Sequence, residues 1–502
     1  MKKLFAFLMC VLMLLALMSG CAKSDGEEVA SGVFTVGYGQ RDISPTWSIY
    51  LRGYGEPHEE RMSTGVSDPI YVNCVAFTDE DGKTILFLSA DLLLAYRDVI
   101  RPVREAIAEA TGVPFDQVMF HCTHNHSGPD LTEVRYSQLL LEKSVEAATM
   151  AMADRKPAQM STGFTRLENV NFVRHYLLTD GSFMGEGVGA VPRNQLVGHT
   201  DAPDNLLQVV RFTREDAKDI IMVNWQGHPK GTAPNPHTMA TSNYPGILRK
   251  TVEEGLDCHA LFVLGGSGNM NNSSQIPGEE KYENYMDLGK GLGEEVIQVT
   301  KNLKSAQTGK IQIAKKDFSY GAVTVPLYAF SVGDLAFATA PFEIFKESAV
   351  AVKEASQFKM TFYASCSNES HGYLSTPPSY AYFSYESGSN PMGIAEGVQE
   401  NLTALVDEIF TASGNAPAQW DEGYHTPEFV PFTDGVEYIN PKAGDTTAYT
   451  AVKNGYYQIT MIAGTTVKDM LTSSEEVAQQ VLAKTTMKLL FNEQNVIVGI
   501  AE

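Results

Sequence analysis

Short apolar runs with strand-like composition alternate with longer amphipathic segments along most of the chain, and this pattern limits the fold more than any other feature. Residues 71–77 and 84–88 flank an acidic turn, as the two strands of a hairpin do. Residues 206–212 and 220–225 form a second expected hairpin. Strands and helices that alternate in this way pack as layers, so we expect an α/β fold with mixed β-sheets and packed helices.

The helix and strand signals extend this expectation to most of the chain. Asp98 is a candidate helix cap and Gly112 a candidate helix end. The other expected elements are helices at 245–256 and 342–355 and strands at 117–122, 261–264, 335–339 and 360–365. We therefore predict one large domain over residues 34–412.

The composition changes near residues 413–417, which are rich in small and turn-forming residues. Strand-like runs follow at 456–462, 487–491 and 496–500, with a short helical pattern at 475–482. We predict a small strand-rich C-terminal α+β module over residues 420–502.

The first residues are typical of a targeting signal. Lys2 and Lys3 precede an apolar run at residues 4–18, which is short for a transmembrane helix. The run ends in Met18-Ser19-Gly20-Cys21, similar to a bacterial lipobox except for Met18 in place of the usual Leu. We predict a lipoprotein signal peptide at 1–20, acylation of Cys21 and a flexible tether at 21–33. The protein would then be an extracytoplasmic lipoprotein of the cell membrane; ordinary signal-peptide cleavage is the alternative.

Charge and cysteine content exclude some classes of partner and site. The formal net charge of −22 disfavours nucleic acid and anionic lipid headgroups as broad partners. It does not indicate an oligomeric state. Beyond Cys21, Cys74, Cys122, Cys258 and Cys366 remain, and none lies in a Cys-x-x-Cys motif, which argues against a zinc knuckle. Disulfides and buried free thiols are both compatible with this spacing.

Histidines gather at the ends of two expected strands. Of 11 His, three lie within six residues: His121, His124 and His126, just before Gly128-Pro129. In extended backbone His124 and His126 point to the same side, where they can share a metal, or one can ligate while the other carries a proton. His228 follows a second apolar strand and precedes Pro229. Taken alone, each block is more often structural, surface or half-buried than part of a metal site.

Together these blocks resemble the neutral, non-lysosomal ceramidases. Residues 123–129, Thr-His-Asn-His-Ser-Gly-Pro, are similar to that family's Thr-His-Thr-His-Ser-Gly-Pro, with Asn125 in place of the middle Thr. Residues 37–45 resemble its opening strand, residues 171–176 its arginine-bearing loop, and residues 224–229 its second histidine block. The resemblance covers roughly residues 34–410.

The resemblance implies one Zn²⁺ per chain, bound by two His, one Glu and one Tyr. The matching positions are His124, His228, Glu343 at the expected start of the 342–355 helix, and Tyr373. Tyr385 and Arg174 match the family's second site tyrosine and its loop arginine, which implies catalytic roles for both; packing or surface roles are the alternatives. His126, two residues from a ligand, is our candidate for the group that moves protons. We also expect Asp91 to hold a ligand His from behind or to cap a helix.

One block departs from the family. Where the family has an active-site Ser and a nearby Asp, this chain has Asn271 and Asn269, which we assign to substrate binding. A serine nucleophile is therefore not supported, whereas an activated water is. The resemblance implies a zinc-dependent hydrolase of an N-acyl amide, ceramide or a related N-acyl lipid. A non-catalytic, surface-anchored ligand-binding lipoprotein and a zinc acyl esterase are the alternatives.

Overall fold

The computed structural model describes residues 32–55, 59–178, 183–185, 195–231, 233–376, 384–390 and 393–425, followed by the backbone of five tail strands. The predicted signal peptide, Cys21, the tether up to residue 31 and the predicted helix at 475–482 lie outside the described residues. In the part of the chain that is described, no helix combines the length and the apolar character needed to cross a membrane.

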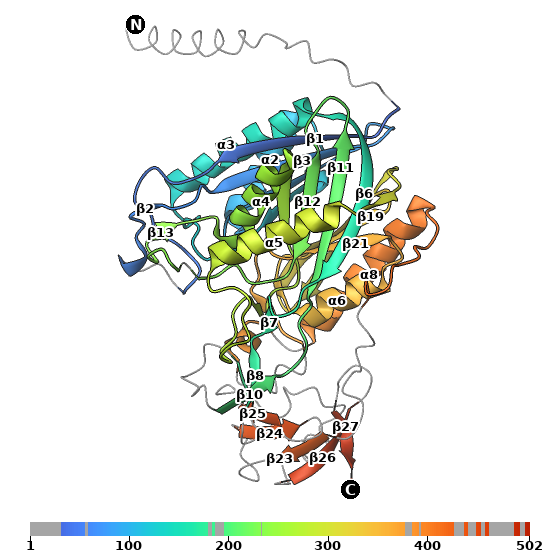
Figure 1. Ribbon diagram of the computed structural model, residues 1–502. Coiled ribbons are helices and arrows are strands. Elements are labelled where there is room, and N and C mark those ends of the chain that lie inside the picture. Colours follow the sequence, from blue (N-terminus) through green and yellow to red (C-terminus); the bar gives the residue numbers. More distant parts are fainter. Residues whose placement is uncertain are drawn as a thin grey trace, which may run out of the picture. The chain divides into compact units, whose positions relative to one another are not determined.

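A large mixed sheet forms the first half of the fold (Figure 1). Its strand order is β14-β12-β11-β6-β1-β3-β4-β5, and β16 adds to β6. The strands are β1 Thr35–Asp42, β3 Tyr71–Thr78, β4 Thr84–Ala90, β5 Val118–Cys122, β6 Lys156–Arg166, β11 Leu206–Arg214, β12 Ile220–Trp225, β14 His259–Leu264 and β16 Lys304–Ala306. Both expected hairpins are confirmed, since β3 pairs with β4 and β11 with β12 in antiparallel register. The β4–β5 and β12–β14 pairs are parallel.

A second sheet of four strands has the order β17-β18-β19-β21. Its strands are β17 Ile311–Tyr320, β18 Val323–Val332, β19 Leu335–Thr339 and β21 Met360–Ala364. The β19–β21 pair is again parallel, so this sheet also gathers carboxyl ends of strands at one edge.

The two sheets pack face to face. Phe77 and Phe87 of the large sheet contact Phe337 of the small one, with ring centroids 6.4 and 5.3 Å apart. Neighbouring residues of the same strands, such as Cys74 and Leu88, face the opposite way and pack under helices. Both faces of the large sheet are thus apolar, as expected for strands buried on both sides.

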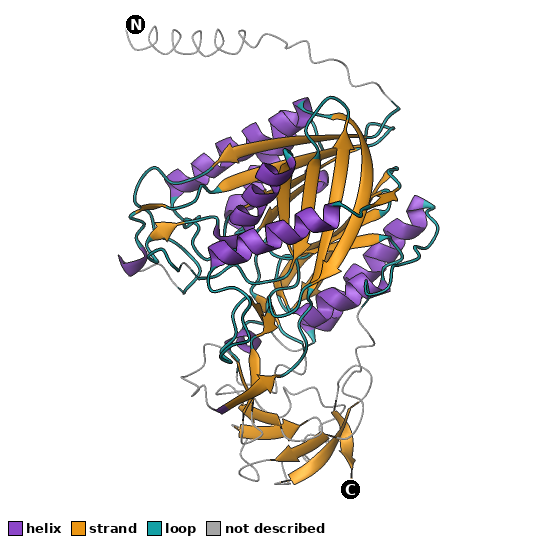
Figure 2. Cartoon of the chain, in the orientation of Figure 1, coloured by secondary structure: helices purple, strands orange, loops and turns teal. Residues whose placement is uncertain are grey.

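Helices cover the outer faces of both sheets (Figure 2). The helices are α2 Arg97–Thr111, α3 Val134–Ala153, α4 Asn243–Leu256, α5 Tyr285–Thr300, α6 Lys346–Ala355 and α8 Ile394–Ser413. Two apolar clusters lie between the large sheet and the pairs α2–α3 and α4–α5, and a third lies between the small sheet and α6 and α8. The predicted mixed α/β class is confirmed as four layers, helix–sheet–sheet–helix.

Two element boundaries differ from the predictions. The helix expected at 342–355 begins only at Lys346, because β20 (Glu343–Ile344) pairs in parallel with β22 (Tyr373–Leu374). Asp98 lies in the first turn of α2 and is not its cap, since Tyr96 precedes the helix without a side-chain hydrogen bond. The predicted end of α2 is confirmed: Gly112 is left-handed, with φ of 73°.

Short strands and a tail sheet complete the described chain. The short elements are β2 Gly65–Val66, β7 Phe172–Val173, β8 His175–Leu178, β9 Phe183–Gly185, β10 Leu196–His199, β13 Met239–Ala240, β15 Met270–Asn271 and the 3₁₀ turns Glu59–Arg61, Phe115–Gln117 and Tyr385–Gly388. The tail strands are β23 Val436–Ile439, β24 Ala448–Val452, β25 Tyr457–Thr460, β26 Thr486–Phe491 and β27 Ile497–Ala501, in the order β25-β24-β23-β26-β27. The four cysteines that the sequence left open are buried free thiols.

Candidate metal centre

Carboxyl ends of strands from both sheets bring the predicted ligands together. His124 and His126 follow β5, His228 follows β12, and Glu343 follows β19. Each of these strands belongs to a parallel pair, and loops at the carboxyl ends of such strands are where α/β folds build their sites.

The three imidazoles converge on one point. The Nε2 atoms of His124 and His228 are 3.0 Å apart, those of His124 and His126 3.2 Å, and those of His126 and His228 2.9 Å. A carboxylate oxygen of Glu343 lies 3.1 Å from Nε2 of His124. All four side chains are buried, and the three histidines form a group that can hold a metal ion.

Hydrogen bonds at Nδ1 of His124 and of His228 determine whether Nε2 of each ring carries a proton. Nδ1 of His124 lies 3.0 Å from the carbonyl oxygen of Leu93, and Nδ1 of His228 lies 3.2 Å from that of Ser267. A carbonyl oxygen only accepts, so each Nδ1 carries a proton and donates it. In the neutral rings both Nε2 atoms then present bare lone pairs, a repulsive arrangement that a cation between them would relieve.

The pKa of His228 and the separations between the Nε2 atoms are both consistent with a cation between the rings. Burial, followed by the neighbouring His124, holds the pKa of His228 well below its usual value, so its ring is neutral. Ligands 2.0–2.1 Å from a tetrahedral zinc ion lie about 3.3 Å from one another, close to the separations found here. The residues present therefore fit a zinc ion.

His126 differs from the other two histidines. Its Nδ1 is buried and has no hydrogen-bond partner among the described residues. Metal-ligating histidines almost always donate their second N–H to a carbonyl or carboxylate, as His124 and His228 do. Burial and the neighbouring His124 also hold the pKa of His126 well below its usual value. Nε2 of His126 thus lies beside those of the other two histidines, but its Nδ1 has no hydrogen-bond partner in the described chain.

The loop that carries His124 and His126 is not an extended strand. His124 is left-handed, with φ of 62°, a conformation that a non-glycine residue adopts only when its surroundings enforce it. The extended backbone expected through His124 and His126 is therefore wrong, although the two rings do converge. Gly53, with φ of 125°, packs directly on this loop: a Cβ there would lie 2.5 Å from Cα of His126.

Tyr373 lies beside Glu343 as its partner in the parallel β20–β22 pair. Burial would raise the pKa of Glu343, but the neighbouring His124, the Tyr373 hydroxyl and Arg174 outweigh burial and lower it. Burial and then the charge of Glu343 raise the pKa of Tyr373 well above its usual value. The Tyr373 hydroxyl is 3.4 Å from that of Tyr385, which is 47% exposed and so is available to a substrate.

Arg174 is buried next to these two tyrosines. Its Nε lies 2.7 Å from a carboxylate oxygen of Glu386, and its Nη2 donates to the Gly268 carbonyl at 2.6 Å. The guanidinium carbon is 5.5 Å from the ring centre of Tyr373 and 5.4 Å from that of Tyr385. Arg174 therefore holds the tyrosine pair in place through cation–π contacts and its buried ion pair.

The two asparagines assigned to substrate binding lie next to the site. The Asn269 amide group donates to both carboxylate oxygens of Glu347 at 3.1 and 3.0 Å, and its Oδ1 accepts from the Lys346 backbone N–H. These bonds tie Asn269 to the start of α6. Asn271 is fully buried, and its backbone forms a parallel bridge with His228. Through this bridge, the segment around Asn271 holds the backbone of His228.

Two other residues noted in the sequence have structural roles. His121 is a core residue: its Nε2 accepts from the Leu264 N–H at 3.0 Å and its Nδ1 lies 2.7 Å from the Ser365 carbonyl, so it joins three strands. Burial lowers its pKa to about 3. Among the described residues, the Asp91 carboxylate forms no hydrogen bond with a histidine and caps no helix; it pairs with Arg249 at 2.6 Å.

Two residues near the site were not predicted. Glu386 directly follows Tyr385, and its burial and its pairing with Arg174 depend on contacts between distant segments. Tyr54 lies edge-on to His126 with ring centroids 5.2 Å apart and is 40% exposed. The two glycines that flank it, Gly53 and Gly55, were the signal that the sequence offered for a specialised loop. Both have positive φ in the structure.

Comparisons with known proteins agree with this geometry at the level of the fold. The sequence matches no protein-family model and no curated protein. The solved structures that are similar to this chain include the neutral ceramidase from Pseudomonas aeruginosa and a ceramidase in complex with C2. Each has a TM-score of 0.63 and 15% sequence identity, over 84% of this chain and 84% of the other. This chain has the neutral ceramidase fold. Its histidine cluster lies at strand ends of that ceramidase-like fold.

Proposed function

We propose that this chain is a zinc-dependent hydrolase that cleaves an N-acyl amide bond with an activated water. One zinc ion per chain would be held by His124, His228, Glu343 and Tyr373. The observation that carries this proposal is the pair of Nε2 atoms of His124 and His228, which lie 3.0 Å apart on rings whose Nδ1 atoms each face a carbonyl oxygen. Bound zinc would act as a Lewis acid on the scissile carbonyl and would lower the pKa of a bound water to about 7.

His126 is the group that moves the proton. Its Nε2 lies within 3.2 Å of both histidine ligands, and its ring is neutral because burial lowers its pKa. A neutral imidazole there can take a proton from the attacking water and return it to the leaving nitrogen. Its Nδ1, without a carbonyl behind it in the described chain, sets it apart from the ligands.

Tyr385 is placed to stabilise the negative charge that develops on the scissile carbonyl oxygen. Tyr385 is partly exposed, yet desolvation by the groups around its hydroxyl raises its pKa, so the hydroxyl keeps its proton and can donate it in a hydrogen bond. Arg174 positions this hydroxyl through its contact with the ring. Asn271, beside His228, would then shape the pocket where the related family has a serine.

The substrate we propose is ceramide or a related N-acyl lipid. The similar structures are named as ceramidases, and this supports the choice of bond class. A lipid anchor on Cys21 would place the enzyme outside the cytoplasm at a membrane surface, where such substrates reside.

A substrate panel tests this proposal. We would offer the full-length, zinc-loaded protein a fluorescent N-acyl-sphingosine, simple N-acyl amides and acyl esters of equal chain length. We expect amide cleavage that stops when zinc is removed by a chelator and returns when zinc is supplied. Cleavage of esters alone would instead indicate a zinc acyl esterase. Binding of the N-acyl lipid without turnover by zinc-loaded protein would indicate a ligand-binding lipoprotein.

A further inference from the structure

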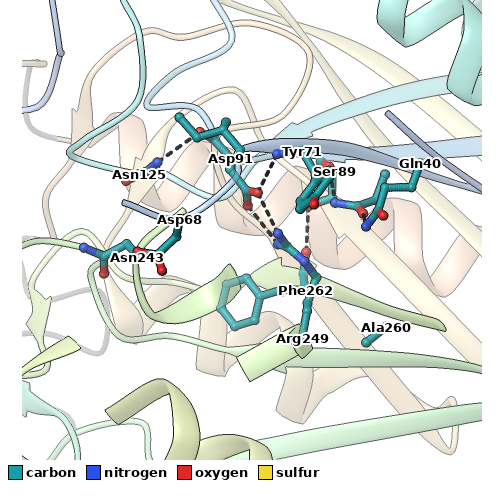
Figure 3. Close-up of polar contacts among 12 residues, drawn as sticks. Gln40, Asp68, Tyr71, Ser89, Asp91, Asn125, Asn243, Arg249, Ala260 and Phe262 are labelled. Carbon is teal, nitrogen blue, oxygen red and sulfur yellow. Dashed lines mark hydrogen bonds and ion pairs between the residues drawn. The ribbon is translucent and has the colours of Figure 1, made fainter. Parts of the chain in front are cut away.

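A buried ion pair lies behind the loop that carries His124 and His126. Asp91, directly after β4, accepts from Arg249 of α4 through both carboxylate oxygens, at 2.8 and 2.6 Å (Figure 3). The two side chains are 0% and 3% exposed. Asp91 also exchanges hydrogen bonds with the backbone of Tyr71 at the start of β3. The pair thus ties the end of β4 to β3 and α4.

The backbone that follows β4 supports the histidine loop. The Leu93 carbonyl accepts from Nδ1 of His124, and the Leu92 carbonyl accepts from the Asn125 N–H at 3.0 Å. Gly128, at the end of the loop, approaches the Asp91 carbonyl so closely that a Cβ would lie 3.0 Å away. The direction of the His124 ring therefore depends on where residues 91–93 lie.

Asn125 makes a second connection between the same two elements. Its amide group donates to the carbonyls of Asp91 at 3.0 Å and Thr241 at 2.6 Å, and its Oδ1 accepts from the Ser127 N–H at 2.9 Å. Thr241 lies two residues before α4, the helix that carries Arg249. The hydroxyl of Thr241 in turn donates to Asp68 at 2.6 Å.

We propose that Asn125 and the Asp91–Arg249 pair are positioning residues for the metal centre. Neither contacts the point where the Nε2 atoms meet. Together they clamp the loop between the end of β4 and the start of α4, and so hold His124 in its left-handed conformation with Nε2 aimed at the metal. Residues that fix metal ligands from behind contribute strongly to metal affinity. This inference rests on the proposed metal-dependent function.

The test compares two buried asparagines. Asn125→Ala removes two amide-to-carbonyl bonds behind the histidine loop. Asn224→Ala removes two similar bonds, to the carbonyls of Val263 and Tyr363 at 2.9 and 3.1 Å, in an equally buried position between strands. For wild type and both variants we would measure the urea midpoint of the metal-free protein, zinc affinity against a chromophoric chelator, and the visible spectrum of the cobalt-loaded protein.

We expect both variants to lose stability, but only Asn125→Ala to lose about 10- to 100-fold in zinc affinity and to change the cobalt spectrum. Equal zinc affinity and unchanged spectra in both variants would overturn the positioning role while leaving the metal centre intact. A wild-type protein that binds no zinc would overturn the proposed function itself. If Asn125→Ala does not fold, Asn125→Ser, which keeps one hydroxyl donor, replaces it, with a smaller loss of zinc affinity expected and unchanged affinity again contradicting the role.

Discussion

At the scale of single residues, the three histidines of the site differ in the hydrogen-bond partner of their Nδ1 atoms. Nδ1 of His124 and of His228 faces a carbonyl, whereas Nδ1 of His126 has no partner in the described chain. The sequence predicted all three as site residues because the blocks that carry them resemble those of the neutral ceramidases; their position after apolar strands was a weak signal alone. It did not predict the turn at His124, because a positive φ in a non-glycine residue arises from its surroundings.

His126→Gln separates a proton-carrying role from a ligand role. We expect the variant to keep about one zinc per chain and to lose about 10²- to 10⁴-fold in kcat, because general acid–base catalysis contributes on that scale. His199→Gln is the matched control, since His199 pairs with Glu279 at 2.9 Å and is not one of the three converging histidines. Metal content by mass spectrometry and kcat decide the outcome. Loss of zinc from His126→Gln would show that His126 is a ligand.

Tyr385→Phe and Tyr373→Phe test the catalytic role of Tyr385 and the metal-binding role of Tyr373 separately. Removing the Tyr385 hydroxyl should lower kcat by roughly 10²-fold with zinc affinity unchanged, because the lost donor acts on developing charge. Removing the Tyr373 hydroxyl, which bonds to Glu343, should weaken zinc affinity. The two assignments would be reversed if Tyr385→Phe weakened zinc binding and Tyr373→Phe did not.

At the scale of helices and strands, local patterns predicted most elements and long-range pairing decided the rest. The 71–77 and 84–88 runs are strands because their alternating residues serve two apolar clusters, a pattern visible in the sequence. Glu343 was expected at a helix start, yet it lies in β20. Its partner Tyr373 is distant in the chain, and no local signal at Glu343 indicates that pairing.

The end of α2 offers a test at this scale. Gly112→Ala places a Cβ in open space but in a left-handed conformation with φ of 73°. We expect a loss of about 1 kcal/mol in the free energy of unfolding. Gly198→Ala, also in open space but without a positive φ, should change stability little. Urea unfolding measures both variants, with zinc content expected to stay at wild-type level. Equal stabilities would mean that the backbone conformation of Gly112 contributes nothing.

At the scale of the whole molecule, two sheets packed face to face bring three strand ends to one place. The sequence predicted the mixed α/β class from the alternation of its elements, but not the four layers. Layer order depends on contacts such as Phe87 with Phe337, between residues far apart in the chain. The same packing brings Glu343, which follows β19 of the four-stranded sheet, to His124, which follows β5 of the large sheet, so an intact metal centre depends on both sheets.

The most direct measurement is the zinc content of the full chain, taken together with that of His124→Ala. Mass spectrometry of the purified proteins after zinc is supplied and excess is removed should give about one zinc per wild-type chain and none bound stably in the variant. Hydrolysis of an N-acyl amide should be lost together with the metal. A wild-type protein that stays free of metal, or a His124→Ala variant that keeps both zinc and activity, would contradict the assignment of the histidine cluster as a catalytic zinc site.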